Sequence, residues 1–192
     1  MKNLCIFRLR DATVALALIV SPLLASAPAM AQDGPGNKPE IMAPMHEAKP
    51  KVASTSFTVR LGDKSITISP AEFATLPHET VAVTNGHTKA AETYTGVTIA
   101  TLLDKLGLPF TKTNEHTLLK TILVAEGTDG YKVILSTYET LATIRGKKAI
   151  VADTLDGTHL DKDGAFKLVI PGDSRPQRWV QNLKSLTFKT VE

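Results

Sequence analysis

The chain has 192 residues, of which 43% are hydrophobic, 21% charged and 5% aromatic, and its formal net charge is +3. This length suits one compact domain rather than two. The N-terminus accounts for part of the hydrophobic total, because residues 1–10 carry three cations and residues 12–24 are almost wholly apolar. Together with the small-x-small sequence Ala29-Met30-Ala31, these features predict a signal peptide over residues 1–31 and a mature start at Gln32.

Removal of this signal peptide has two consequences for function. The 22 basic and 19 acidic residues lose three and one respectively, so the mature net charge is +1, which gives no electrostatic basis for nucleic-acid binding. The only cysteine, Cys5, is removed as well, which excludes disulfides, thiol nucleophiles and thiolate metal ligands. We expect a soluble periplasmic protein, because no second apolar span follows.

The spacing of apolar, turn and capping residues predicts the elements of the mature chain. Residues 32–52 are rich in Pro, Gly and Lys without an apolar period, so we interpret them as a disordered leader. The folded domain is expected over residues 53–192. In chain order we expect strands at 57–61 and 66–68, a short helix at 69–76, a strand at 80–83, a helix at 98–106, and strands at 122–124, 131–135, 149–152, 166–170 and 179–188.

Local signals support the two helices in particular. Ser69 and Glu72 have the spacing of a helix capping box, with Pro70 at the first helical position. Apolar residues at 99, 102, 103 and 106 share one helix face, and Gly107 follows where a left-handed cap belongs. Short strands with small interspersed helices, without a regular strand–helix alternation, predict a mixed α+β domain.

Generic catalytic and metal-binding patterns are absent from the sequence. There is no glycine-rich phosphate loop, no G-x-S-x-G elbow and no H-E-x-x-H motif. The five histidines, at 46, 78, 87, 116 and 159, form no pair at helical spacing, so we interpret them as surface or capping residues and expect no metal site. The charged segment 145–148 is interpreted as a solvated loop.

A polar loop with two arginines and the only tryptophan follows a strand-like run near the C-terminus. Residues 164–180 read GAFKLVIPGDSRPQRWV. This run resembles the oxidoreductase molybdopterin-binding domain, the fold of sulfite oxidase, in which an L-V-x-P-G-D and R-W-V stretch helps to hold the pterin cofactor. Tyr-Thr-Gly-Val at 94–97 and Asp-Gly-Tyr at 129–131 are similar to two further segments of that family. The resemblance covers nearly all of residues 55–190 and implies a sulfite-oxidase-like fold of mixed β-sheets with short helices.

The sequence departs from the family at the metal ligand. Sulfite-oxidase-like enzymes bind molybdenum through a cysteine shortly before the segment that corresponds to 94–97, because a thiolate is soft enough to join the dithiolene sulfurs. The corresponding region here, 83–89, has no cysteine, so molybdenum is not expected. In this respect the chain resembles small exported proteins of the same fold, the periplasmic pterin-binding signalling proteins, which report to a membrane-bound cyclic-di-GMP enzyme.

Three of the candidate ligand-binding residues follow from what a flat pterin with a donor edge and a carbonyl requires. Trp179 offers a ring face, and its structural alternative is a core or interface tryptophan. Arg178 offers donors for a carbonyl or phosphate, and its alternative is a solvated loop residue. Asp129 offers a carboxylate to the amino-pyrimidine edge, and its alternative is a turn-forming aspartate.

Three further candidates complete the predicted site. Tyr131 belongs to the Asp-Gly-Tyr segment and Arg175 to the C-terminal loop. His87 lies in the segment where the family has its cysteine, and Glu92 and Tyr94 follow on the same connection. We interpret these last three residues as solvent-exposed, with a ligand contact as the alternative.

The combined prediction is a soluble periplasmic binding protein for a pterin-like ligand, without catalytic residues, that signals through the periplasmic domain of a membrane protein. Two other classes stay open at this point, because a fold does not fix a function. One is a molybdopterin-dependent oxidoreductase, and the other is an interaction module that binds no ligand.

Overall fold

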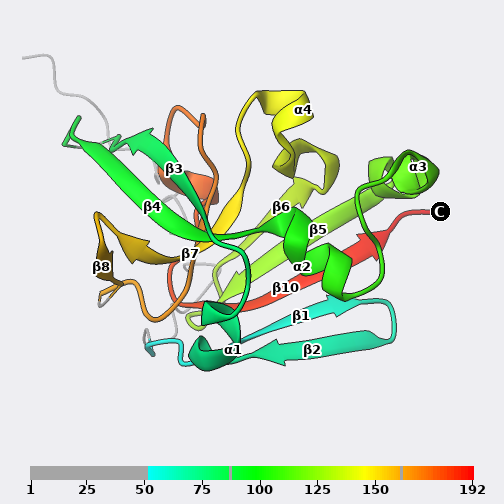
Figure 1. Cartoon of the computed structure of the whole chain (residues 1–192), viewed down its shortest axis with the longest axis horizontal. Helices are drawn as coiled ribbons and strands as arrows, with labels where there is room; N and C mark the ends of the chain where they lie inside the picture. The colour runs from blue at the N-terminus through cyan, green and yellow to red at the C-terminus, as the bar shows by residue number, and fades with distance from the viewer. Residues whose placement is uncertain (1–51, 87, 161) are drawn as a thin grey trace, which may run out of the picture. The chain divides into compact units, whose positions relative to one another are not determined.

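The computed structural model describes residues 52–86, 88–160 and 162–192 (Figure 1). The predicted signal peptide 1–31 and the predicted leader, apart from Val52, lie outside the described residues, as does His87. Within the described part of the chain, no helix combines the length and the apolar character needed to cross a membrane.

The described residues form short strands separated by short helices. The strands are β1 (Phe57–Leu61), β2 (Lys64–Ile68), β3 (Glu79–Thr84), β4 (Ala91–Thr98), β5 (Thr121–Gly127), β6 (Lys132–Ser136), β7 (Ile150–Leu155), β8 (Thr158–His159), β9 (Lys167–Val169) and β10 (Leu183–Thr190). The helices are α1 (Pro70–Ala74), α2 (Ile99–Lys105), α3 (Glu115–Leu119) and α4 (Ala142–Arg145), with 3-10 turns η1 (Lys112–Asn114), η2 (Tyr138–Thr140) and η3 (Pro176–Arg178).

The strands make two sheets. The first has the order β2-β1-β10-β5-β6, in which β1 and β10 are parallel and the other neighbours antiparallel (Figure 1). The second has the order β3-β4-β7-β8, and β9 pairs with β7 as well. β9 also forms one bridge, from Leu168 to Val180. After η3 and this bridge, the chain enters β10 of the first sheet.

Local signals in the sequence set the helix boundaries. At α1 the backbone N–H of Ser69 donates to the Glu72 carboxylate at 2.8 Å and the N–H of Glu72 donates to the Ser69 hydroxyl at 3.3 Å, which confirms the capping box. The helix ends at Ala74, slightly earlier than predicted. At α2 the Thr98 side chain caps the first turn, and Gly107 has the left-handed φ of 81° that was expected after this helix.

The core lies between the two sheets. Its largest cluster combines inward residues of the first sheet, such as Val59, Leu123 and Leu186, with Val97 and Val151 of the second. All five are essentially inaccessible to solvent, and burial of each side chain stabilises the fold by about 1.5–3 kcal/mol relative to an exposed position.

The second sheet has an apolar cluster on its other face as well. This smaller cluster contains Tyr94, Ile150 and Ala152, and Trp179 packs against it. Because β7 contributes Ile150 and Ala152 to one face and Val151 to the other, a continuous apolar run suits it better than an alternating one.

Two sequence predictions need correction, one for the start of the last strand and one for the charged segment 145–148. The last strand begins at Leu183 rather than at Trp179, because residues 176–178 form a 3-10 turn and Asn182 has a φ of 49° that interrupts an extended chain. The charged segment 145–148 is a solvated loop only in part. Residues 146–148 are exposed and follow α4, whereas Arg145 belongs to the helix, and Lys148 pairs with Glu79 on β3 at 2.7 Å.

Candidate functional site

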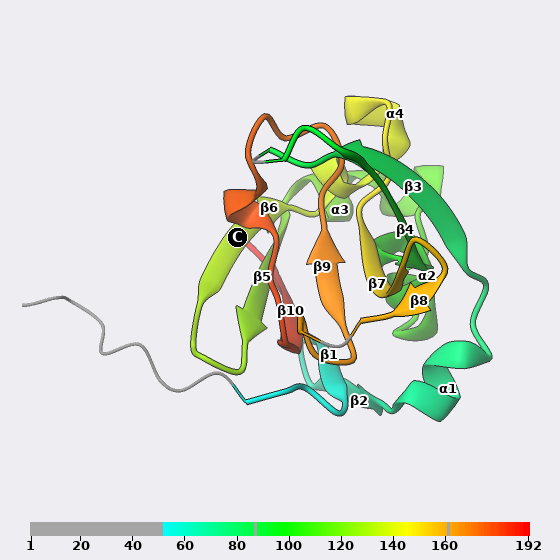
Figure 2. The ribbon, with the colours of Figure 1, turned by 90° about the vertical axis from the view of Figure 1, so that its left-hand side faces the viewer.

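A cavity of about 440 Å³ opens where three loops meet: the turn after β3, the tip of the β5–β6 hairpin and the loop between β9 and η3. Figure 2 shows the loop after β9 beside the turn between β3 and β4. The cavity is lined by Thr84, Asn85, Gly86, Glu92, Tyr94, Asp129, Tyr131, Lys167, Asp173, Ser174, Arg175, Pro176, Gln177, Trp179 and Gln181.

Two glycines allow these loops to approach each other. A Cβ atom on Gly86 would lie 3.3 Å from the Pro176 side chain, at the contact between the β3–β4 turn and η3. A Cβ atom on Gly127, at the end of β5, would lie 3.0 Å from the backbone oxygen of Gln181. Glycine at both positions therefore brings the walls of the cavity together.

Lys167 and Tyr94 form the deep end of the cavity. They are 7% and 2% exposed, whereas every other lining residue is more accessible. Lys167 Nζ donates hydrogen bonds to the Tyr94 hydroxyl at 3.1 Å and to Asp163 Oδ2 at 2.6 Å. The Tyr94 hydroxyl in turn donates to the Glu92 carboxylate at 3.1 Å.

The protonation states at this deep end are fixed by these contacts. Burial alone would lower the pKa of Lys167, but its hydrogen bonds to Asp163 and Tyr94 outweigh burial and raise the pKa above its usual value. Burial raises the pKa of Tyr94, against the opposing effect of the lysine. At neutral pH the lysine is therefore a cation and the tyrosine a neutral hydroxyl, an arrangement suited to binding rather than to proton abstraction.

Glu92 connects the deep end to the mouth of the cavity. Its carboxylate accepts hydrogen bonds from the Tyr94 hydroxyl and, at 2.5 Å, from the side-chain amide of Asn85. Both Glu92 and Tyr94 lie on β4, two residues apart, so they share one face of the strand. The sequence-based interpretation of Tyr94 as solvent-exposed was wrong, because this face packs on the cavity and on the smaller core cluster.

Trp179 is both a packed residue and a lining residue, so the two alternatives weighed for it are not exclusive. Its indole N–H donates to the backbone oxygen of Ile170 at 2.9 Å, which fixes the orientation of the ring. The ring meets Tyr94 edge-to-face at 5.6 Å between centroids, and Lys167 Nζ lies 5.5 Å from the indole centroid. An aromatic surface of fixed orientation therefore borders the buried ammonium.

Asp129 and Tyr131 line the cavity from the β5–β6 hairpin. Asp129 Oδ1 accepts the backbone N–H of Tyr131 at 3.0 Å, so the turn-forming role considered for this aspartate is present. The same side chain lines the cavity. The Tyr131 hydroxyl donates to the backbone oxygen of Gln177, which ties the hairpin to η3 across the cavity mouth.

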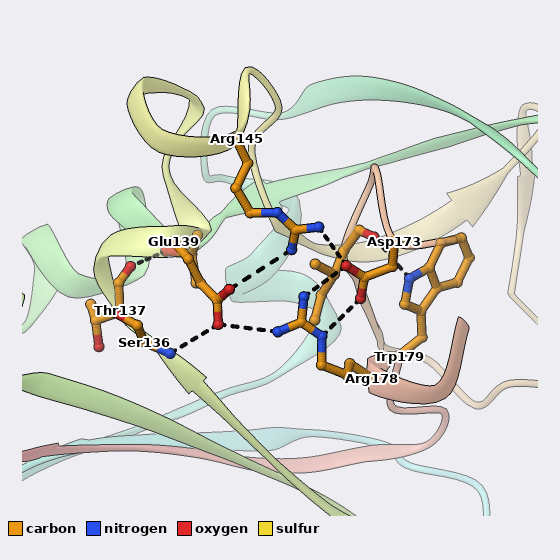
Figure 3. Close-up of polar contacts among 9 residues, drawn as sticks. Ser136, Thr137, Glu139, Arg145, Asp173, Arg178 and Trp179 are labelled. Atoms are coloured by element: carbon orange, nitrogen blue, oxygen red, sulfur yellow. Dashed lines mark hydrogen bonds and ion pairs between the residues drawn. The ribbon is translucent and has the colours of Figure 1, made fainter. Parts of the chain in front are cut away.

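Arg178 is not among the residues that line the cavity, and its guanidinium is held in an ion-pair cluster (Figure 3). Its Nε and Nη2 donate to the two oxygens of Asp173 at 2.9 and 2.7 Å, and Nη1 donates to Glu139 at 3.1 Å. Arg145 donates to the same Asp173 at 2.5 Å. Arg178 is therefore an ion-paired residue rather than a plain solvated loop residue, and its predicted contact with a ligand stays a prediction.

The ion-pair cluster anchors the loop that carries several lining residues. Burial alone would raise the pKa of Asp173, but hydrogen bonds from Arg178 and Arg145 outweigh it and hold the pKa below its usual range. Glu139 on η2 also accepts the backbone N–H of Ser136 at 3.0 Å. The cluster therefore links η2 and α4 to the loop between β9 and η3.

The predicted site residues separate into three groups. Trp179, Asp129, Tyr131 and Arg175 all line the cavity, Arg178 does not, and His87 lies outside the described residues. Sequence reasoning missed Lys167. A lysine inside the otherwise apolar strand Phe166–Ile170 was a usable signal, because a charged residue at a buried strand position needs a polar partner.

Within the described residues, no group of three or more His, Cys, Asp or Glu side chains is arranged to hold a metal ion. The polar lining groups of the cavity are carboxylates, amides, hydroxyls and two cations, without a thiolate. Soft metal ions prefer thiolate ligands, so this set of donors does not fit a sulfite-oxidase-type molybdenum centre.

No protein-family model matches the chain, and no curated protein sequence matches it. Among solved structures, the chain is similar to the sulfane dehydrogenase SoxCD from Paracoccus pantotrophus, with a TM-score of 0.55 and 18% sequence identity. The match covers 71% of this chain and 39% of that chain. Together with the two sheets, of which the first is mixed and the second antiparallel, and the short helices, this similarity confirms the α+β, sulfite-oxidase-like fold that was predicted from the sequence.

Proposed function

We propose that the chain binds a pterin-like heterocycle in the cavity and acts as a binding protein rather than as a redox enzyme. The observation that carries this proposal is the convergence of an aromatic ring, carboxylates and a buried ammonium on one cavity of about 440 Å³. A cavity of this size accommodates a small-molecule ligand.

The chemistry of the lining is complementary to a pterin. Trp179 and Tyr131 provide aromatic surface for a flat bicycle, and such contacts add about 1 kcal/mol beyond burial. The carboxylates of Asp129 and Glu92 can accept hydrogen bonds from the amino-pyrimidine edge. Lys167 and Arg175 can donate to the carbonyl and ring nitrogens.

The similarity to the sulfane dehydrogenase SoxCD makes a molybdopterin-dependent oxidoreductase the second candidate. Such an enzyme requires a protein ligand to molybdenum, and the residues described around the cavity offer only oxygen and nitrogen atoms for this purpose. We therefore rank it below ligand binding without molybdenum. An interaction module that binds no ligand is the outcome to which a failure of both candidates would point.

We further propose that the protein is exported and reports to the periplasmic domain of a membrane protein, such as a cyclic-di-GMP enzyme. The basic residues 1–10, the apolar residues 12–24 and the Ala29-Met30-Ala31 sequence support export. The resemblance to periplasmic pterin-binding signalling proteins supports the partner. Intact-mass measurement after periplasmic extraction tests export, with a chain that starts at Gln32 as the expected product.

Binding is tested by titration of purified protein with reduced and oxidised pterins, and by extraction of any pterin that co-purifies from the native periplasm. Asp129→Asn is the informative variant, because asparagine keeps the turn-forming acceptor for the Tyr131 N–H but loses the negative charge. We expect it to weaken pterin binding about tenfold without lowering the melting temperature.

The control for this variant is Glu79→Gln, which removes a carboxylate that pairs with Lys148 outside the cavity. It should bind pterin like the native protein. Absence of pterin binding by the native protein would contradict the proposed function. If the native protein and Asp129→Asn bind pterin with equal affinity, the carboxylate of Asp129 does not contribute to pterin binding.

A further inference from the structure

The ammonium group of Lys167, at the deep end of the cavity, can donate one more hydrogen bond than it makes with the described residues. Among the described residues, Lys167 Nζ donates two hydrogen bonds, to Tyr94 and to Asp163. An ammonium group has three hydrogens. Lys167 is 7% exposed and lines the cavity, and its Nζ lies 4.9 and 5.5 Å from the Tyr94 and Trp179 ring centroids. The third hydrogen is therefore left to face these rings or an acceptor within that space.

The charges around this ammonium favour a neutral acceptor over an anionic one. Asp163 Oδ2 lies 2.6 Å from Nζ and already balances its charge. Glu92 adds a second carboxylate, linked to the lysine through the Tyr94 hydroxyl. A ligand carboxylate or phosphate at this end would meet two carboxylates against one ammonium, whereas a ring carbonyl oxygen accepts the hydrogen without that repulsion.

The neighbouring hydroxyl cannot take over this role. The Tyr94 hydroxyl uses its single hydrogen in the bond to Glu92 and accepts the bond from Lys167. A ligand group that reaches the deep end therefore meets Lys167 as its donor. An amino group in place of the carbonyl would bring donor against donor and leave the buried ammonium hydrogen unpaired.

Resting on the proposed function, we propose that Lys167 is a specificity residue that selects heterocycles with a ring carbonyl and rejects analogues with an amino group at the same position. The ligand class is thereby narrowed to 2-amino-4-oxo-pteridines. Sites built around a buried hydrogen-bonding group reject analogues that lack its partner more strongly than apolar pockets reject a change in size.

The test compares the binding of pterin and of 2,4-diaminopteridine by calorimetry at neutral pH. The second ligand has an amino group at ring position 4, where pterin has the carbonyl oxygen. We expect the native protein to bind pterin at least about tenfold more tightly. Lys167→Met should lose this preference, with pterin weakened about tenfold and diaminopteridine changed by less than about threefold. Lys184→Met, which removes an exposed lysine on β10, is the matched control and should keep the native preference.

Loss of Lys167 leaves Asp163 unpaired, so the double variant Asp163→Asn, Lys167→Met is measured alongside, with near-ultraviolet circular dichroism to verify the fold. A native protein that binds both ligands equally, or a folded lysine variant that keeps the preference for pterin, would overturn the inference and leave the proposed function intact. A native protein that binds neither ligand would overturn the proposed function itself.

Discussion

Asp173 and Arg178 form a bidentate ion pair, with Nε–Oδ2 and Nη2–Oδ1 distances of 2.9 and 2.7 Å (Figure 3). Bidentate pairing of this kind is stronger and more directional than a single contact. The Asp173 side chain is 9% exposed, and Arg145 donates to it from α4. The loop that forms one wall of the cavity is thus held from two sides by charge.

This pair predicts a specific dependence of stability on pH. The folded-state pKa of Asp173 lies below its unfolded value of about 3.9, so its contribution is present above that pH and is lost as the pH falls through the folded pKa. We expect Asp173→Asn to be less stable than the native protein by about 1–3 kcal/mol at neutral pH. The difference should shrink below about pH 4.

Urea unfolding as a function of pH measures this effect directly. Glu79→Gln serves as a control, because its pair with Lys148 is exposed and contributes about 0–1 kcal/mol. Parallel pH curves for the native protein and Asp173→Asn would show that the ion pair is not coupled to folding.

A second prediction concerns Gly96, at the point where β4 pairs with a bulge in β7. The pairing of β4 with β7 shifts register between Thr95 and Gly96, and a Cβ atom on Gly96 would lie 1.9 Å from the Val151 carbonyl oxygen. Gly96→Ala should therefore cost more than about 3 kcal/mol or prevent folding.

The control for Gly96→Ala is Gly157→Ala, at the turn between β7 and β8. This glycine has a φ of 79° but open space around its Cβ position, so only the left-handed conformation is penalised, by about 1–2 kcal/mol. Thermal unfolding of the two variants compares them, and similar melting temperatures would refute the steric argument.

A change of burial along β4 explains why this strand was not predicted from the sequence. In its first half Glu92 and Tyr94 point to the cavity face, whereas in its second half three consecutive residues, 96–98, are buried. Apolar and polar residues therefore do not alternate over the whole length of β4. Its first half contains polar residues because it lines the cavity. The hairpin β1–β2 and the capping box of α1 were predictable, because each depends on residues within one short segment.

Residues of the candidate site were predictable only where they lie in a short motif that resembles the family. Asp129, Tyr131 and Trp179 lie in such motifs, and all three line the cavity. Arg178 pairs with Asp173 five residues before it, but its third contact is with Glu139, which is 39 residues away in the sequence. Lys167 likewise depends on Tyr94, 73 residues away. Partnerships at such separations leave no local pattern in a single sequence.

A third prediction concerns metal content. The cavity lining offers no thiolate, and the only cysteine of the chain, Cys5, lies in the predicted signal peptide. We expect protein purified from its native host to contain no stoichiometric molybdenum. Elemental analysis checks this expectation, and one molybdenum atom per chain would point to an oxygen or nitrogen ligand in the segment 83–89.

The last prediction separates two neighbouring residues by their positions relative to the cavity. Trp179 lines it, whereas Arg178 faces the ion-pair cluster. Trp179→Ala should therefore weaken pterin binding about fivefold to tenfold through loss of the ring face, and Trp179→Phe should weaken it less. Arg178→Ala should lower the melting temperature, because it leaves Asp173 with one arginine, yet change pterin affinity less than Trp179→Ala does. Calorimetry well below each melting temperature makes the comparison on folded protein. A larger loss of affinity in Arg178→Ala than in Trp179→Ala would place the ligand against the arginine rather than against the indole ring.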